Sequence, residues 1–164
     1  MTIVARGGDA TRFDAFRALH LVETEPTFRR RWLLALATFE APPLAARAVD
    51  LAFGDEVPLQ DTASFAATLL GNRTAREPFW ARLRRDWSAY HSRLRAAPML
   101  LRRVVESMGA LVERRHLEEV EAFLAAHPVE EARQAIAQTV ERMRQDVALR
   151  ERTQRAIGDW LRTR

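Results

Sequence analysis

Residues 74–94 read TAREPFWARLRRDWSAYHSRL and carry the clearest structural signal in this 164-residue chain. Their apolar residues recur at steps of three and four, which places them on one side of a helix: Trp80, Leu83, Trp87, Tyr90 and Leu94. Thr74 is a candidate cap, and Pro78 falls in the first turn, where its missing N–H costs little. The stretch therefore predicts a helix that buries an aromatic stripe.

Upstream of this stretch, the chain divides into four shorter segments, each with an apolar stripe. Asp9 or Thr11 can cap the first segment, because Asp and Thr side chains accept bonds from exposed helix N–H groups. The third segment runs over residues 44–53 and ends at Gly54, which predicts a left-handed C-cap. Asp61 precedes the fourth segment, and we interpret it as a helix cap rather than a substrate contact.

Downstream, the same punctuation continues to the end of the chain. A helix is expected after Pro98, and a shorter one ends at His127. The last stretch runs over residues 130–161, with a weakly signalled break near Leu149. No strand-like alternation and no low-complexity linker interrupts the pattern.

The length and the pattern together indicate one domain, because domains of this size are typical. We predict an all-α fold over residues 1–164. It is a superhelical array of about eight or nine antiparallel helices, that is, a HEAT-like α-α superhelix.

The composition narrows the possible partners. All 26 basic residues are arginine, against 22 acidic residues, and acids interrupt almost every arginine run. This is typical of a solvated helix surface, so we expect no nucleic-acid partner. No apolar run approaches the roughly 20 residues of a membrane span, and the N-terminus does not resemble a signal peptide. Cysteine is absent, which favours a reducing compartment, and we expect a cytoplasmic, membrane-free protein.

No motif predicts chemistry in this chain. The sequence that starts at His116 is the one most similar to the zinc-binding H-E-x-x-H helix, but Val120 occupies the position of the second histidine ligand. We therefore interpret His116 as a surface or capping residue. The paired acids Glu118-Glu119 and Glu130-Glu131 are expected at helix starts, where carboxylates offset the helix dipole. We therefore predict no catalytic residue and no metal ligand here.

The large aromatic residues at helical spacing are interpreted as packing residues: Trp80, Trp87, Phe123 and Trp160. Arg133 and Glu141 lie about two helical turns apart, so both could face one neighbouring element.

Five landmarks in fixed order carry a resemblance to a known family. They are VPLQD at residues 57–61, FWARLRRDW at 79–87, LEEVEAFLAAHP at 117–128, ARQAIAQTVERM at 132–143 and DWL at 159–161. In their order and spacing they resemble the C-terminal helical domain of zinc aminopeptidases of the aminopeptidase N family, which includes the puromycin-sensitive and endoplasmic-reticulum types. The resemblance covers residues 40–164, and residues 1–40 follow it by helix pattern only.

The resemblance implies that this chain is the end of a larger enzyme that removes N-terminal residues from peptides. In that family the zinc ion, its H-E-x-x-H helix and the G-x-M-E-N motif lie in a preceding catalytic domain. The C-terminal domain encloses the active site and limits substrate access. The implied partners are the catalytic domain of the same polypeptide and peptide substrates. The isolated chain is expected to be inactive and to hold no zinc, and its substrate-binding residues stay unassigned.

Two other functions fit the residues alone. A free-standing helical-repeat module would bind a protein partner through aromatic or arginine anchors. An arginine-rich nucleic-acid binder would gather its arginines on one face and lose affinity steeply with salt.

Overall fold

The computed structural model describes residues 5–163. Within these residues the chain forms nine α-helices, three short 3-10 helices and no strand, which confirms the all-α prediction. The α-helices are α2 (Ala10–Val22), α3 (Pro26–Leu36), α4 (Pro42–Phe53), α5 (Thr62–Gly71), α6 (Arg76–Arg85), α7 (Trp87–Leu94), α8 (Pro98–Ser107), α9 (Arg114–Ala126) and α10 (Arg133–Arg162). The 3-10 helices are η1 (Leu59–Asp61), η2 (Met108–Ala110) and η3 (Glu130–Ala132).

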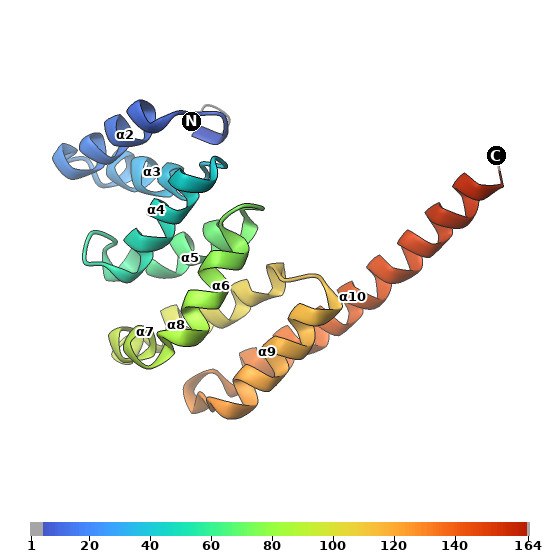
Figure 1. Cartoon of the computed structure of the whole chain (residues 1–164). Helices are drawn as coiled ribbons and strands as arrows, with labels where there is room; N and C mark the ends of the chain where they lie inside the picture. The colour runs from blue at the N-terminus through green and yellow to red at the C-terminus, as the bar shows by residue number, and fades with distance from the viewer. Residues whose placement is uncertain (1–4, 164) are drawn as a thin grey trace.

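The helices stack as four successive units in two rows. One row contains α3, α5, α8 and α10, each packed on the next. The other row contains α2, α4, α6 with α7, and α9. The four units are therefore α2–α3, α4–α5, α6–α8 and α9–α10, and they begin at residues 10, 42, 76 and 114. Figure 1 shows the units following one another from the blue N-terminal end to the orange α9–α10 pair. Serial stacking of helical pairs is the arrangement expected of a HEAT-like array.

The helix starts follow local chemistry that the sequence displays. The Asp9 carboxylate accepts from the Arg12 N–H at 2.9 Å and caps α2, as predicted. Glu25 does the same for α3 through the Phe28 N–H at 2.8 Å, and prolines occupy the first turns of α3, α4 and α8.

Three predicted caps are wrong in detail. Gly54 does end α4, but its φ of −93° and ψ of −172° are extended, not left-handed. Asp61 occupies the N-cap position of α5, yet its carboxylate makes no cap bond and instead accepts from Arg30 Nε at 2.8 Å. Thr74 is not a cap either, because the Asn72 side chain accepts from the Thr74 N–H at 2.9 Å.

The helix predicted over residues 74–94 bends into α6 and α7 at Asp86, where φ is −103° and ψ is 18°. Helical hydrogen bonds continue around the bend, from the Asp86 N–H to the Arg82 carbonyl and from the Tyr90 N–H to the Asp86 carbonyl. The Asp86 carboxylate pairs with Arg82 and Arg85. The bend keeps Trp87 and Tyr90 in the core.

The aromatic stripe forms the core that joins the third unit to the fourth. Trp80 and Trp87 both meet Phe123 of α9 edge-on, with ring centroids 5.3 Å and 5.2 Å apart. These residues are buried, as predicted, and the Trp80 Nε1–H donates to Glu119 at 2.7 Å. Trp160 is the exception: it is 53% exposed, so its interpretation as a packing residue is wrong.

The last helix, α10, is continuous from Arg133 to Arg162, so the break expected near Leu149 is absent. Val147 is its last buried residue, and beyond it the helix runs away from the other helices (Figure 1). Among the described residues Arg133 and Glu141 have no ion-pair or hydrogen-bond partner in common: Arg133 pairs with Glu130, and Glu141 contacts Arg144 and Gln145 within α10.

Candidate functional site

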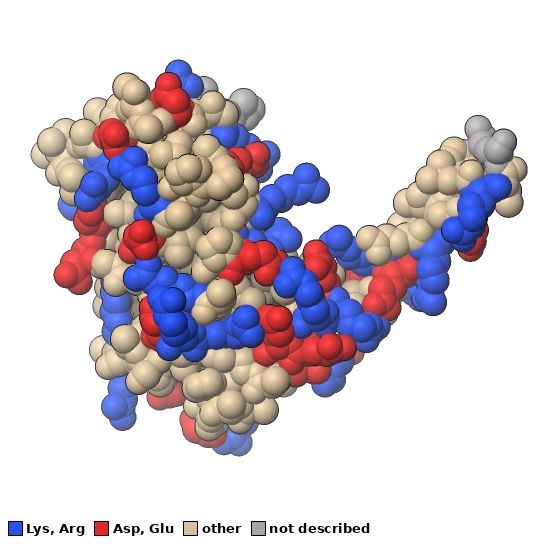
Figure 2. All heavy atoms as spheres, in the orientation of Figure 1, with Lys and Arg blue, Asp and Glu red and all other residues tan. Residues whose placement is uncertain are grey.

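Arginines link one helical unit to the next. Arg47 of α4 reaches back to Asp14 of α2, and Arg82 of α6 reaches back to Asp50 of α4. In both cases the guanidinium also lies over a phenylalanine of the earlier helix, 4.4 Å and 4.6 Å from the ring centroid. Arginine suits this role because its planar fork can pair with a carboxylate while its face stacks on a ring. Many of the arginines are therefore engaged with acids, and Figure 2 shows the two charges interleaved over the visible face.

His116 and Glu77 are the one pair within the described residues that resembles acid–base machinery. His116 is fully buried, so its interpretation as a surface or capping residue is wrong. Its Nε2 lies 2.8 Å from Glu77 Oε1, and Arg115 donates to the same carboxylate at 2.6 Å. Burial opposes ionisation of Glu77, but the hydrogen bonds from Arg115 and His116 outweigh it and hold the pKa of Glu77 below its usual value. This arrangement joins α6 to α9.

The residues do not fit a zinc site. Across residues 5–163 no group of three or more histidine and carboxylate side chains is placed to hold a metal ion. The two pairs of acids expected at helix starts differ in outcome, because only one pair lies in a first turn. Glu119 lies in the second turn of α9, where it accepts from Trp80 and pairs with Arg84 at 3.4 Å. Glu130 and Glu131 lie in the first turn of η3, directly before α10, which confirms their expected place at a helix start.

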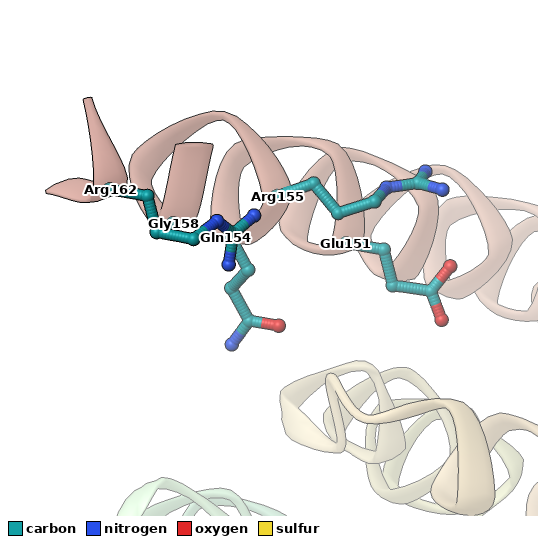
Figure 3. Close-up of a pocket in the computed structure, with 5 residues that line it drawn as sticks. All are labelled: Glu151, Gln154, Arg155, Gly158 and Arg162. Carbon is teal, nitrogen blue, oxygen red and sulfur yellow. The ribbon is translucent and has the colours of Figure 1, made fainter. Parts of the chain in front are cut away.

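A shallow, open groove runs along one side of the outer half of α10. It consists of two adjoining hollows of about 430 Å³ and about 230 Å³, which share Glu151 and Gln154. We call it the α10 groove, lined by Val112, Glu113, Arg114, Val147, Arg150, Glu151, Gln154, Arg155, Gly158 and Arg162. Figure 3 shows the outer hollow, in which Arg155 and Glu151 extend from one side of the helix.

The α10 groove carries more positive than negative charge. Arg114 of α9 clamps Glu151 through two hydrogen bonds of 2.7 Å and 2.8 Å, and this contact lowers the pKa of Glu151. Arg162 pairs with Asp159, whereas Arg155 makes no hydrogen bond or ion pair with another described residue. Such a lining can receive an anionic group such as a carboxylate, since arginine binds carboxylates in a bidentate manner. It offers no evident proton-transfer machinery.

Sequence reasoning missed this groove, although a signal was present. Glu151, Arg155, Gly158 and Arg162 follow one another at steps of four, three and four, which places them on one side of a helix. The pattern does not reveal that α9 contributes Arg114, because that depends on how the two helices pack.

The opposite end of the array exposes an apolar surface. Leu21 and Val22 end α2 with 55% and 72% of their surface exposed, and Phe28 in the first turn of α3 is 47% exposed. We call these three residues the end patch. Exposed apolar side chains that gather in one region are candidates for contact with another surface.

None of the helices within the described residues combines the length and apolar character of a membrane span.

Comparison with known families identifies the fold. The chain matches the family described as ERAP1-like C-terminal domain over residues 1–145, which takes in every helical unit and ends within α10. This agrees with the resemblance carried by the landmarks of the sequence and with the stack of helical pairs. The chain belongs to the ERAP1-like C-terminal domain family, an aminopeptidase-associated family.

Proposed function

We propose that residues 1–164 form the C-terminal accessory domain of a zinc aminopeptidase that removes N-terminal residues from peptides. The observation that carries this proposal is the family match over residues 1–145. In this role the domain encloses the active site and limits which substrates reach it, while the zinc ion and the catalytic residues belong to another domain of the polypeptide. The isolated chain is then inactive.

The packing of the chain suits an enclosing role. A wall that excludes water and large substrates needs a stiff scaffold, and this array is stiffened by ion pairs and stacked arginines between units. The α10 groove is the surface that we assign to the peptide, since its positive lining suits a peptide carboxylate. The end patch is the surface that we assign to the rest of the polypeptide, the catalytic domain included.

A first experiment tests the origin of the chain. An epitope tag is placed in frame after Arg164 in the source cells, and the tagged protein is sized and fractionated. We expect a polypeptide several times larger than 18.8 kDa, found in the cytoplasm, with an aminopeptidase activity that a zinc chelator abolishes. A tagged product near 18.8 kDa without such activity would instead support a free-standing interaction module.

A second experiment tests the α10 groove in that native polypeptide. Arg155→Glu reverses a charge in the groove, and Arg142→Glu makes the same change on an exposed part of α10 outside it. We expect Arg155→Glu to raise KM about tenfold for peptides with a free carboxylate, because a charge-assisted bond of about 1.5 kcal/mol is lost. The KM for amidated peptides should rise less. Arg142→Glu should leave the KM for free and for amidated peptides unchanged. Equal effects on free and amidated peptides would refute the assignment.

A further inference from the structure

The outer end of α10, residues 148–162, differs from the rest of the array. The family match stops at residue 145, and Val147 is the last buried side chain of the helix. After that, Glu151 and Gly158 are half-buried and the other residues up to 162 are exposed. A helix of this length is marginally stable alone in water, so one that leaves the core gains from a covering partner.

This segment has an apolar side that faces away from the α10 groove. Leu149 and Trp160 are 54% and 53% exposed, and Ala156 lies between them. At 3.6 residues per turn these three lie within about 40° of one another around the helix axis, with Thr153 beside them. Ile157 and Leu161, 52% and 62% exposed, widen the stripe on one flank. Glu151, Arg155 and Arg162 of the groove project from the opposite side.

The order of residues in this stripe is self-complementary. If two copies of the segment run antiparallel, Leu149 of one lies opposite Trp160 of the other, and Thr153 lies opposite Ala156. Both pairs have their midpoint between residues 154 and 155, so one twofold axis satisfies them together. The steps of four, three and four along Leu149, Thr153, Ala156 and Trp160 are those of a coiled-coil seam.

Charges on the flank fit the same axis. Arg152 and Asp159 lie on one side of the stripe, and in the antiparallel pairing Arg152 of each copy lies beside Asp159 of the other. Among the described residues Arg152 has no ion pair, while Asp159 pairs only with the exposed Arg162. Because of the twofold symmetry, the contact between Arg152 and Asp159 occurs twice in the dimer.

We propose that the outer end of α10 is a self-association surface, which pairs antiparallel with the same segment of a second copy of this chain through Leu149, Ala156 and Trp160. The paired stripe is about 16 Å long, short beside a standard protein interface, so the dimer is weak, with a Kd of about 10–500 µM. The α10 groove stays open in this pairing because it lies on the opposite side of the helix.

Sedimentation analysis of the purified chain from micromolar to millimolar concentration tests the proposal. The mean mass of the wild type should rise from 18.8 kDa toward twice that value. Arg152→Asp alone or Asp159→Arg alone should raise Kd about tenfold, since each turns two attractive contacts into repulsive ones. The double variant Arg152→Asp/Asp159→Arg should restore the wild-type Kd.

A matched pair of substitutions separates the stripe from a general effect of charge. Trp160→Glu places a carboxylate in the stripe and should abolish the dimer, whereas Gln154→Glu adds the same charge to the groove side and should leave it intact. Both residues are exposed beyond the core, so circular dichroism and melting should match the wild type. A chain that stays monomeric at all concentrations, or a double variant that does not recover, overturns the proposal. Because only this chain is used, the result is independent of the aminopeptidase assignment.

Discussion

Asn72 holds the corner between the first two helical units and the third. Its Nδ2 donates to the Ala37 carbonyl at 3.0 Å and to the Phe39 carbonyl at 2.8 Å, both in the segment that joins α3 to α4. Its Oδ1 accepts from the N–H groups of Thr74 at 2.9 Å and Ala75 at 3.3 Å, at the start of α6. The residue is 6% exposed, so little water can replace these bonds.

Asn72→Ala should therefore lower the free energy of unfolding by about 3–4 kcal/mol. Four hydrogen bonds are lost, each with a net contribution of about 1 kcal/mol, and the 3.3 Å bond contributes least. Asn72→Asp keeps an acceptor for Thr74 and Ala75 but turns a carboxylate oxygen toward the carbonyls of Ala37 and Phe39. Since that oxygen cannot donate and repels them, Asn72→Asp should destabilise the chain at least as much as Asn72→Ala at pH 7.

Urea unfolding followed by circular dichroism measures both effects. Gln134→Ala removes an amide of the same chemistry from an exposed position of α10 and serves as the control, with an expected change under about 0.5 kcal/mol. The reasoning would be refuted by a loss below about 1 kcal/mol for Asn72→Ala, or by an Asn72→Asp chain that is more stable than the Asn72→Ala chain.

Three further changes follow from named contacts. Burial opposes ionisation of Glu77, but hydrogen bonds from Arg115 and His116 outweigh it and lower the pKa of Glu77 in the folded state. The ionised carboxylate therefore stabilises the fold at any pH above the unfolded-state pKa of about 4.3. This stability is lost as the pH falls through the lower folded-state pKa. The difference in unfolding free energy between wild type and Glu77→Gln should accordingly shrink from pH 7 to pH 3, and a constant difference would contradict this. Tyr90→Phe removes a buried hydroxyl that has no hydrogen-bond partner among the described residues, so its melting temperature should be equal or higher; a clear drop would show a missed partner. The Arg93 guanidinium donates to the carbonyls of Gly54, at 2.9 Å, and of Val57, and a lysine at this position cannot span both. Arg93→Lys should therefore lower the free energy of unfolding in urea by about 1–2 kcal/mol. An unchanged urea midpoint would rule this out.

Local signals in the sequence predicted the helices well and their caps unevenly. Asp9 caps α2 because the competing partners are few at an exposed helix start. Asp61 carries an equally good cap signal, but Arg30 approaches it from α3 and takes the carboxylate instead. Similarly, Asn72 rather than Thr74 serves the start of α6, since its side chain can also bind the segment that joins α3 to α4. A cap prediction fails where a distant element offers a stronger partner.

In the candidate site, too, the sequence predicts what depends on neighbouring residues and misses what depends on packing. The steps of four and three that place Arg155 and Arg162 on one side of α10 are readable in the sequence, but the clamp from Arg114 on Glu151 is not. His116 likewise reads as a surface residue by its neighbours in sequence, and only the packing of α9 on α6 buries it against Glu77.

The sequence by itself determined the helical class, the approximate helix boundaries and the aromatic stripe. These depend on propensity, on proline and glycine punctuation and on periodicity, all of which act within a few residues. Only the tertiary structure decided which arginine meets which acid, that the helix over residues 74–94 bends at Asp86, and that α10 leaves the core after Val147. The arginine pairs between units join residues more than 30 positions apart, which are brought together by how successive helical units stack, and no local pattern encodes that geometry.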